Sequence, residues 1–397
     1  MLIVVQNLPV PLDRRVWMEC QALRAEGYDV SVICPTGRQE SSTREVVDGV
    51  HIYRYRPAPQ ANGTAGYVLE FAYSWLRTAW LSLKVWRRHR FDAIQACNPP
   101  DTYWALALLY RFAGVRFVFD QHDLCPEVFM SRFESQAGVQ LSLLRGLEWA
   151  SYRTADHLVT VNDSYRDVAL GRGRTHPDRV TVVRSGPDRE RMRRGAPKPE
   201  LRDGRPRLAC YLGVMGPQDG VDLLIRAVDV YVHDLGRDDC TFVLLGFGDC
   251  LDDLRTLSAD LGLDRWITFP GRADDVMITD YLSTADLGLD PDPLNPLNDV
   301  STMNKVLEYM AFELPVVAFA LRETRVSAAA AARYVRPNDV DEFAKAMAEL
   351  LDDPDESRKM GQLGRQRIDD EFGWHHQAPR YVDVYRRLIG TPSGAAS

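Results

Sequence analysis

Lys305 and Glu308 are the residues of this sequence whose types and spacing most directly suggest chemistry. They stand three positions apart, so they share one side of a helix that we expect to begin at Ser301, whose hydroxyl suits an N-cap. The first turn of a helix attracts anions, and a cation beside a carboxylate suits a phosphorylated, hydroxyl-rich ligand. On spacing alone, an exposed helical ion pair is the simpler explanation.

The residues K-x-x-E-Y-M-A that start at Lys305, followed by P-V-V from Pro315, resemble the donor-site helix of family 4 retaining glycosyltransferases. The match extends over nearly the whole chain and is strongest to the bacterial branch that makes cell-surface and exopolysaccharide sugars. This resemblance implies the α/β GT-B fold, in which two Rossmann-like domains face a cleft. It also implies retaining transfer of a sugar from a nucleotide diphosphate sugar, with a UDP-sugar as the expected donor and no obligatory metal or other cofactor.

The resemblance also implies roles for residues near this helix. In the family, the second glutamate of a Glu-x7-Glu signature binds the nucleotide ribose, and this role falls on Glu308. Val300 stands where the first glutamate is expected, so the contacts to the donor sugar are unassigned. Asn298 and Asp299 are the nearest candidates for those contacts.

The first glycine-rich loop of the expected second domain, residues 213–220, also departs from the family. Relatives often place a lysine before its last glycine, where this chain has Asp219. The backbone amides near Gly213 and Gly216 can still bind phosphate. We therefore expect Lys305, early in its helix, to have taken over the leaving diphosphate.

Two weaker signals lie in the same half of the chain. Gly246 and Gly248 follow a strand-like run, but Leu251 occupies the third glycine position of a dinucleotide fingerprint, so NAD chemistry is not expected. Arg272 ends the segment F-P-G-R, which in relatives borders the base. A bare turn is the simpler explanation of either segment.

His122 and Arg15 are the candidates in the first half of the chain. His122 follows an apolar run and lies between two aspartates, and family members carry a histidine here beside the donor sugar. Arg15 stands in the first turn of a helix expected from about Asp13, and this segment faces the donor phosphates in the family. A cation opposes the helix dipole there, which suggests function, but solvated side chains at Arg14 and Arg15 are an equally good explanation.

Strand-like apolar runs alternate with helical patterns, which predicts two largely parallel, Rossmann-like sheets. We expect an N-terminal acceptor-side domain over residues 1–186, joined by a C-terminal crossover helix over residues 375–397, and a nucleotide-sugar domain over residues 187–374. Residues 187–206 are rich in Arg, Pro and Gly and predict a linker. The expected strands are Leu2–Gln6, Val30–Cys34, His51–Tyr55, Ala93–Cys97, Phe117–Gln121, Leu158–Asn162, Val180–Arg184, Leu208–Leu212, Phe242–Leu245, Ile267–Phe269, Leu287–Leu289 and Val316–Phe319.

The composition limits the protein's partners and location. A net charge of −8 over 397 residues argues against nucleic-acid binding by the whole molecule. Seven scattered cysteines show no metal-ligand spacing and fit reduced thiols. We see no signal peptide and no apolar run of about eighteen residues, so we expect a cytoplasmic protein.

Two segments raise the question of peripheral membrane contact. Residues 67–90 form a long helical pattern with three tryptophans and a basic end, and apolar residues on nearly all sides predict a buried helix. An interfacial helix at the inner membrane face is the alternative. Residues 172–194 carry eight arginines against three acids, which fits a solvated linker or attraction to lipid phosphate.

The resemblance leaves the acceptor open among a small molecule, a glycan and a lipid-linked sugar. Two other functions remain as alternatives. One is a nucleotide-sugar 2-epimerase of the same fold, whose acid–base residues are not identifiable in this sequence. The other is a non-catalytic protein that binds sugar nucleotides, which the departures at Asp219 and Val300 favour.

Overall fold

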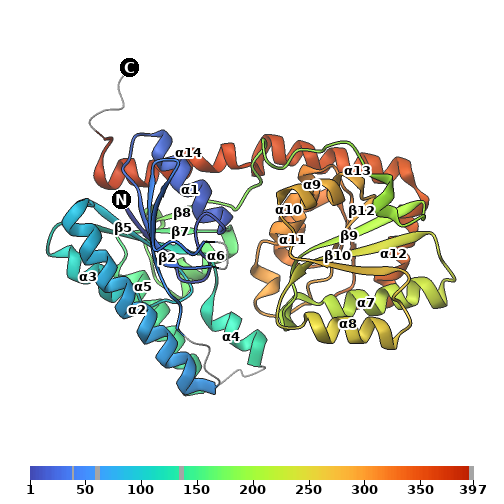
Figure 1. Ribbon diagram of the computed structural model, residues 1–397, viewed down its shortest axis with the longest axis horizontal. Helices are drawn as coiled ribbons and strands as arrows, with labels where there is room; N and C mark the ends of the chain where they lie inside the picture. The colour runs from blue at the N-terminus through green and yellow to red at the C-terminus, as the bar shows by residue number, and fades with distance from the viewer. Residues whose placement is uncertain (38–39, 59–62, 134–137, 393–397) are drawn as a thin grey trace. The chain divides into compact units, whose positions relative to one another are not determined.

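The computed structural model describes residues 1–37, 40–58, 63–133 and 138–392 (Figure 1). The chain divides into two compact units. The first consists of Met1–Met130, Glu134–Ser185 and the residues from Gln377 on, and the second consists of Gly186–His376 with Ser131–Phe133. Each unit is an α/β layer structure around its own sheet, as the alternation of strands and helices predicts.

The first unit contains an eight-stranded sheet in the order β3-β4-β2-β1-β5-β6-β7-β8, in which β3 alone runs antiparallel to its neighbour. Its strands are β1 (Leu2–Val4), β2 (Ser31–Pro35), β3 (Arg44–Val47), β4 (Val50–Tyr55), β5 (Ala93–Cys97), β6 (Arg116–Gln121), β7 (His157–Thr160) and β8 (Val180–Val182). Its central strands are buried on both faces, as parallel strands covered by helices must be. The helices along this part of the chain are α1 (Arg14–Ala25), α2 (Gly63–Arg88), α3 (Trp104–Arg111), α4 (Cys125–Phe133), α5 (Val139–Thr154) and α6 (Asp163–Gly171), with α14 (Trp374–Ile389) returning at the end.

The second unit contains a six-stranded parallel sheet in the order β11-β10-β9-β12-β13-β14. Its strands are β9 (Arg207–Val214), β10 (Cys240–Phe247), β11 (Ile267–Gly271), β12 (Leu287–Asp290), β13 (Val316–Phe319) and β14 (Ala332–Val335). Helices α7, α8 and α12 pack together on one face, and α10, α11 and α13 pack together on the other (Figure 1). The helices are α7 (Val221–Asp229), α8 (Leu251–Asp260), α9 (Asp275–Thr284), α10 (Asn304–Ala311), α11 (Arg322–Ala328), α12 (Val340–Asp352) and α13 (Pro354–Arg367).

Both sheets have a topological switch point, where successive strands are added in opposite directions. In the first sheet it lies between β1 and β5, and in the second it lies between β9 and β12. The loops after the two strands of such a pair diverge and leave room for a ligand at the carboxyl edge of the sheet. The residues that follow these strands are therefore the first place to look for a site.

The organising helix of the second unit begins later than expected. Ser301 is not its N-cap; its hydroxyl donates to the carbonyl of Leu297 at the end of the short 3-10 turn Asn298–Val300. The helix α10 starts at Asn304, so Lys305 is its second residue. The serine instead closes the preceding turn, a local bond that competes with helix capping.

Residues 187–206 are not a free linker. The guanidinium of Arg191 pairs with Asp275, the amide of Gly195 donates to Ser283, and the amide of Lys198 donates to Thr284. These bonds fasten the segment to α9, so it belongs to the second unit.

The prediction that residues 67–90 are buried is wrong for one side of α2. Leu69 and Leu76 are 68% and 64% exposed, whereas Ser74, Thr78 and Ser82 face the core. The tyrosines beneath the helix explain this reversal, because Tyr103 and Tyr110 hydroxyls lie within hydrogen-bond distance of Thr78 and Ser82. Among the described residues, no helix combines the length and apolar character needed to cross a membrane.

Gly246→Ala should destabilise the second unit, because β9 and β10 approach too closely for a side chain there. A Cβ at Gly246 would lie 2.0 Å from the carbonyl oxygen of Gly213. Overpacking of this kind costs about 1–3 kcal/mol, which lowers Tm by several degrees. Gly146→Ala on α5, where a Cβ meets nothing within 4 Å, should instead keep or raise Tm. Equal Tm values for the two variants in thermal circular dichroism would contradict this account.

Candidate functional site

Lys305 lies at the carboxyl edge of the second sheet, beside the end of β12. Its side chain is only 8% exposed, and its ammonium donates to the carboxylate of Asp292. Its Nζ also lies 3.6 Å from Oδ1 of Asp290, the last residue of β12. This burial rules out the exposed ion pair that the spacing alone suggested.

The buried cluster of Lys305, Asp292 and Asp290 brings one ammonium against two carboxyl groups. Burial opposes a charge on Lys305, but the neighbouring carboxylates, Asp292 foremost, raise its pKa above the usual value, so the ammonium persists. Burial and then the charge of Asp292 raise the pKa of Asp290 well above its ordinary range. The cluster is therefore a Lys305–Asp292 ion pair with the carboxyl group of Asp290 beside it.

Tyr309 and Gly213 place Lys305 at the switch point. The Tyr309 hydroxyl accepts the Leu212 amide at 2.8 Å and donates to the Leu289 carbonyl at 3.1 Å, which fastens α10 to both β9 and β12. A Cβ at Gly213 would lie 3.2 Å from Cε of Lys305, so the glycine lets the lysine stem approach the backbone. Glu308 is half-buried and three residues after Lys305, on the same side of α10.

The glycine-rich loop after β9 is closed by its own acidic residue. The Gly216 amide donates to Oδ2 of Asp219 at 2.8 Å, around the 3-10 turn Pro217–Asp219. The carboxylate thus accepts one of the amides that we expected to serve a phosphate. Asp219 also helps to raise the pKa of Lys305, so its charge acts on the cluster next to the loop.

Asn298 and Asp299 hold loops together in this structure. The side-chain amide of Asn298 donates from Nδ2 to the backbone carbonyls of Gln218 and Pro293, at 2.8 and 3.0 Å. Asp299 Oδ1 accepts the Arg322 amide at 2.9 Å, at the start of α11. Both side chains therefore brace the wall of the candidate site.

Gly246, Gly248 and Arg272 lie along the other side of the β9 loop. A Cβ at Gly248 would lie 2.4 Å from the carbonyl oxygen of Met215, so this turn packs its backbone directly on the loop. Arg272 is exposed, with its guanidinium 4.7 Å from the centre of the Phe247 ring. The two glycines therefore have a packing role, and Arg272 is an exposed residue beside Phe247.

Arg15 is buried at the centre of a polar network in the first unit. It follows Asp13, whose carboxylate caps α1 by accepting the Val16 amide. One Nη donates to the Val183 carbonyl and to Ser185 Oγ, and the other donates to Asp120 at 3.1 Å. The explanation of Arg15 as a solvated side chain is therefore wrong.

His122 shares this network with Asp120, at the end of β6. Its Nε2 lies 2.8 Å from Oδ2 of Asp120, and Asn98 Oδ1 accepts its backbone amide at 2.7 Å. Burial would lower the pKa of His122, but Asp120 raises it above the ordinary value. Burial opposes ionisation of Asp120 as well, yet Arg15 and then His122 lower its pKa.

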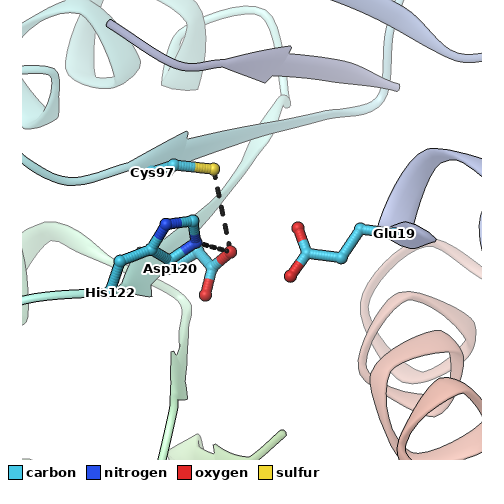
Figure 2. A group of neighbouring side chains, drawn as sticks. All are labelled: Glu19, Cys97, Asp120 and His122. Carbon is cyan, nitrogen blue, oxygen red and sulfur yellow. Dashed lines mark hydrogen bonds and ion pairs between the residues drawn. The ribbon is translucent and has the colours of Figure 1, made fainter. Parts of the chain in front are cut away.

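Glu19 and Cys97 complete the group that Figure 2 shows, with Glu19 pointing toward Asp120 from α1. Their ligand atoms and those of Asp120 and His122 lie within 4.8 Å of one another, a spacing that a metal ion could bridge. Arg15 already supplies positive charge there, with Nε 3.1 Å from Oε1 of Glu19. Burial also raises the pKa of the Cys97 thiol well above its usual value. The arrangement is that of an arginine-centred charge network.

The sequence did not point to several residues that form the Lys305 cluster of the second unit and the Arg15 network of the first. Asp290 and Asp292 stand in the segment L-D-P-D-P directly after an apolar run, which was the available signal. Glu19 sits four residues after Arg15, the helical spacing of a pair. Gln95 lies inside an apolar strand, and its amide donates to both Glu19 and Asp120.

Family models account for most of the chain. Residues 12–186 match the model of the glycosyl transferase 4-like domain, and residues 206–353 match that of the group 1 glycosyl transferases. The chain belongs to this family of glycosyltransferases. It is a glycosyltransferase, and the predicted membership of family 4 is confirmed.

Individual relatives resemble this glycosyltransferase over nearly its full length. The glycogen synthase of Mycobacterium tuberculosis is 27% identical over 94% of this chain and 90% of its own. The sucrose-phosphate synthase of Thermosynechococcus elongatus superposes with a TM-score of 0.79 at 18% identity, over 98% of this chain and 99% of its own. HepE of Anabaena, solved in complex with UDP and glucose, superposes with a TM-score of 0.71 at 15% identity, over 96% of this chain and 98% of its own. These likenesses confirm the GT-B fold.

Glu19→Gln should flatten the pH dependence of the glycosyltransferase's stability. Burial and the charge of Asp120 raise the pKa of Glu19 from 4.5 to about 8, so the folded state keeps a proton that the unfolded chain loses. This contribution is complete below about pH 4.5 and is lost as the pH rises toward about 8.

Thermal unfolding between about pH 5 and 8 tests this sign. The free energy of unfolding should fall with pH by up to about 1.4 kcal/mol per unit on account of Glu19, and the variant should lose that slope. Exposed Glu349→Gln on α12 is the matched control and should leave the slope unchanged. An unaltered slope in Glu19→Gln would mean that Glu19 is ionised in the folded state.

Proposed function

We propose that this glycosyltransferase moves a hexosyl or N-acetylhexosaminyl group from a UDP-sugar to an acceptor hydroxyl with retention of anomeric configuration. The observation that carries the proposal is the buried lysine–carboxylate cluster at the switch point of the second sheet, with Glu308 one turn along the same helix. A switch point is where open α/β sheets bind their ligands. The paired charges there suit a diphosphate next to a ribose.

The relatives support the choice of donor and product class. The Anabaena structure holds UDP and glucose, and the enzyme of Streptomyces kanamyceticus is a 2-deoxystreptamine glucosyltransferase. We extend the UDP-sugar donor to this chain because its fold resembles that of the Anabaena protein and its sequence resembles that of the Streptomyces enzyme. Cell-surface or exopolysaccharide synthesis is the setting we propose, on the K-x-x-E-Y-M-A segment.

Departure of the diphosphate is the step that this site serves. Negative charge grows on the leaving phosphate in the transition state, and preorganised donors that face it lower the barrier. Lys305 is the charged donor that we assign to this task, because the Gly216 amide is already bonded to the carboxylate of Asp219. Because Lys305 now binds Asp292, the phosphate must take over some of the contact that the carboxylate holds.

His122 is the residue of the first unit that we assign to the donor sugar. With Nε2 held by Asp120, the ring is fixed in orientation and Nδ1 is the nitrogen that it offers to a hydroxyl. Arg15 orients this pair by donating from Nε to His122 Nε2 and from Nη2 to Asp120, each at 3.1 Å, and is a positioning residue. Asn98 fixes the backbone of the same turn.

The direct test of the function follows UDP release and the fate of the sugar. Purified protein incubated with UDP-glucose or UDP-N-acetylglucosamine should release UDP slowly, and faster with an acceptor. Recovery of a sugar nucleotide epimerised at C2 would overturn the transferase assignment in favour of a 2-epimerase. Binding of UDP without turnover of any donor would favour a non-catalytic protein.

Glu308→Gln should weaken UDP binding and leave the fold intact. A carboxylate accepts from both ribose hydroxyls, whereas an amide offers one acceptor oxygen and misplaced donors. Each charged hydrogen bond lost costs about 1.5–3 kcal/mol. Titration calorimetry with UDP should show a 10- to 100-fold weaker Kd, since about 1.4 kcal/mol is tenfold. Glu349→Gln serves again as the exposed control, and an unchanged Kd in Glu308→Gln would remove this residue from the site.

The double variant Lys305→Met/Asp292→Asn tests the diphosphate assignment. Lys305→Met alone leaves buried carboxylates without their cation, a loss of about 3–5 kcal/mol that confuses stability with catalysis. Removing both charges should preserve Tm but lower turnover by several orders of magnitude. Asp292→Asn alone should keep or tighten UDP binding, because it releases Lys305 for phosphate.

Exposed Lys345→Met is the matched control for loss of a lysine, and it should turn over donor at the wild-type rate. Near wild-type turnover in the folded double variant would show that the diphosphate is bound by other residues.

A further inference from the structure

The outward side of α2 carries a continuous apolar stripe. Leu69, Tyr73, Leu76, Trp80 and Leu83 recur at intervals of three or four residues, so they share one side of the helix, and each is exposed. The opposite side buries serine and threonine hydroxyls against the domain's tyrosines. Leu81 and Val85 are buried as well, so α2 carries apolar residues toward both the domain and the solvent, whereas an ordinary surface helix is polar on its outer side.

Two neighbouring helices also expose apolar side chains. Ser82 and Trp86 of α2 contact Tyr110 of α3, and Ser151 of α5 donates to the Asp101 carbonyl just before α3. The outer sides of α3 and α5 expose Leu109, Phe112, Leu143 and Trp149, with Phe112 94% exposed. Of the twenty large apolar side chains exposed in the described part of the chain, twelve lie on these three helices or their ends. Clustering of this kind marks an interaction surface.

The same surface is basic in a protein that is acidic overall. The three helices contain seven arginines and lysines against two acids, whereas the whole chain has a net charge of −8. One of those acids, Glu148, is already paired with Arg172. Lys84, Arg87 and Arg88 are exposed beside the stripe, and the Lys84 ammonium lies 3.4 Å from the Trp80 ring centre.

We propose that the face formed by α2, α3 and α5 binds the surface of an anionic phospholipid bilayer. Exposed leucines and tryptophans reach the boundary between headgroups and acyl chains, while the flanking lysine and arginines bind phosphate. The hydroxyl side of α2 stays hydrogen-bonded to its own domain, so the helix lies along the bilayer surface. A second copy of the chain is disfavoured as the occupant, because a symmetric dimer would bring two basic faces together.

The bilayer contact narrows the acceptor class to one held in or at a membrane. This part of the inference rests on the proposed function, whereas the contact itself does not. A lipid-linked sugar in the bilayer would be presented to the first unit, which carries the surface. Transfer to a freely diffusing acceptor would not need contact between the enzyme and a bilayer.

Vesicle flotation without any nucleotide sugar tests the contact independently of catalysis. Full-length protein should float with vesicles of phosphatidylcholine and phosphatidylglycerol and bind vesicles of pure phosphatidylcholine at least tenfold more weakly. Raising the salt concentration should reduce the difference, because charge attraction is screened. Equal recovery with and without anionic lipid would overturn the charge argument, and no binding to either would overturn the proposal.

Two sets of variants locate the contact. Leu76→Glu/Trp80→Glu should abolish flotation, while Val46→Glu, at an exposed apolar position on β3, should float as wild type. Lys84→Glu/Arg87→Glu/Arg88→Glu should lose binding to anionic vesicles, while the same charge change on the second unit, Lys345→Glu/Arg358→Glu/Lys359→Glu, should retain it.

Light scattering and UDP affinity complete the controls. All variants should keep the wild-type UDP affinity, which shows that they are folded. A stable dimer that Leu76→Glu/Trp80→Glu dissociates, with flotation unchanged, would assign the face to self-association and refute the lipid proposal. Failure of the glycosyltransfer assay alone would leave the flotation result standing.

Discussion

The burial of Lys305 at the end of β12 is the interaction on which the second unit's site depends. A buried ammonium is tolerated only beside compensating carboxylates, and Asp292 and Asp290 supply them. To bring these groups together, α10 must be fixed against two strands, which Tyr309 does through Leu212 and Leu289. The glycine at 213 is needed for the same reason, since a side chain there would crowd the lysine stem.

In the first unit, the buried cation that holds the carboxyl groups together is an arginine. Arg15 joins α1, β6 and the end of β8 through bonds to Asp120 and Val183. His122 gains its orientation from Asp120, and burial together with the charge of Asp120 raises the pKa of Glu19. In both units, a cation that follows a switch-point strand in the sequence holds carboxyl groups around it.

The sequence predicts the strands well and the polar contacts poorly. All twelve expected strands are present, because buried parallel strands read as continuous apolar runs. The two missed strands, β3 and β14, are short edge strands with partly exposed residues, so they lack such a run. A serine hydroxyl suits both a helix cap and a turn, so the sequence alone does not decide which of them Ser301 forms. The tertiary fold places it in the turn. Asp292 and Gln95 carry no local pattern that distinguishes them, since their partners come from other elements.

The last helix has a consequence for how the protein is made. Tyr381 and Tyr385 of α14 both donate to Oε1 of Gln95, and Gln95 in turn holds Glu19 and Asp120. The buried network of the first unit is therefore completed only by residues that are synthesised almost three hundred positions after Gln95. A domain can close during synthesis once all of its contacts are present, but this network cannot be completed until α14 has been synthesised. The second unit, continuous from Gly186 to His376 apart from one short segment, is complete first.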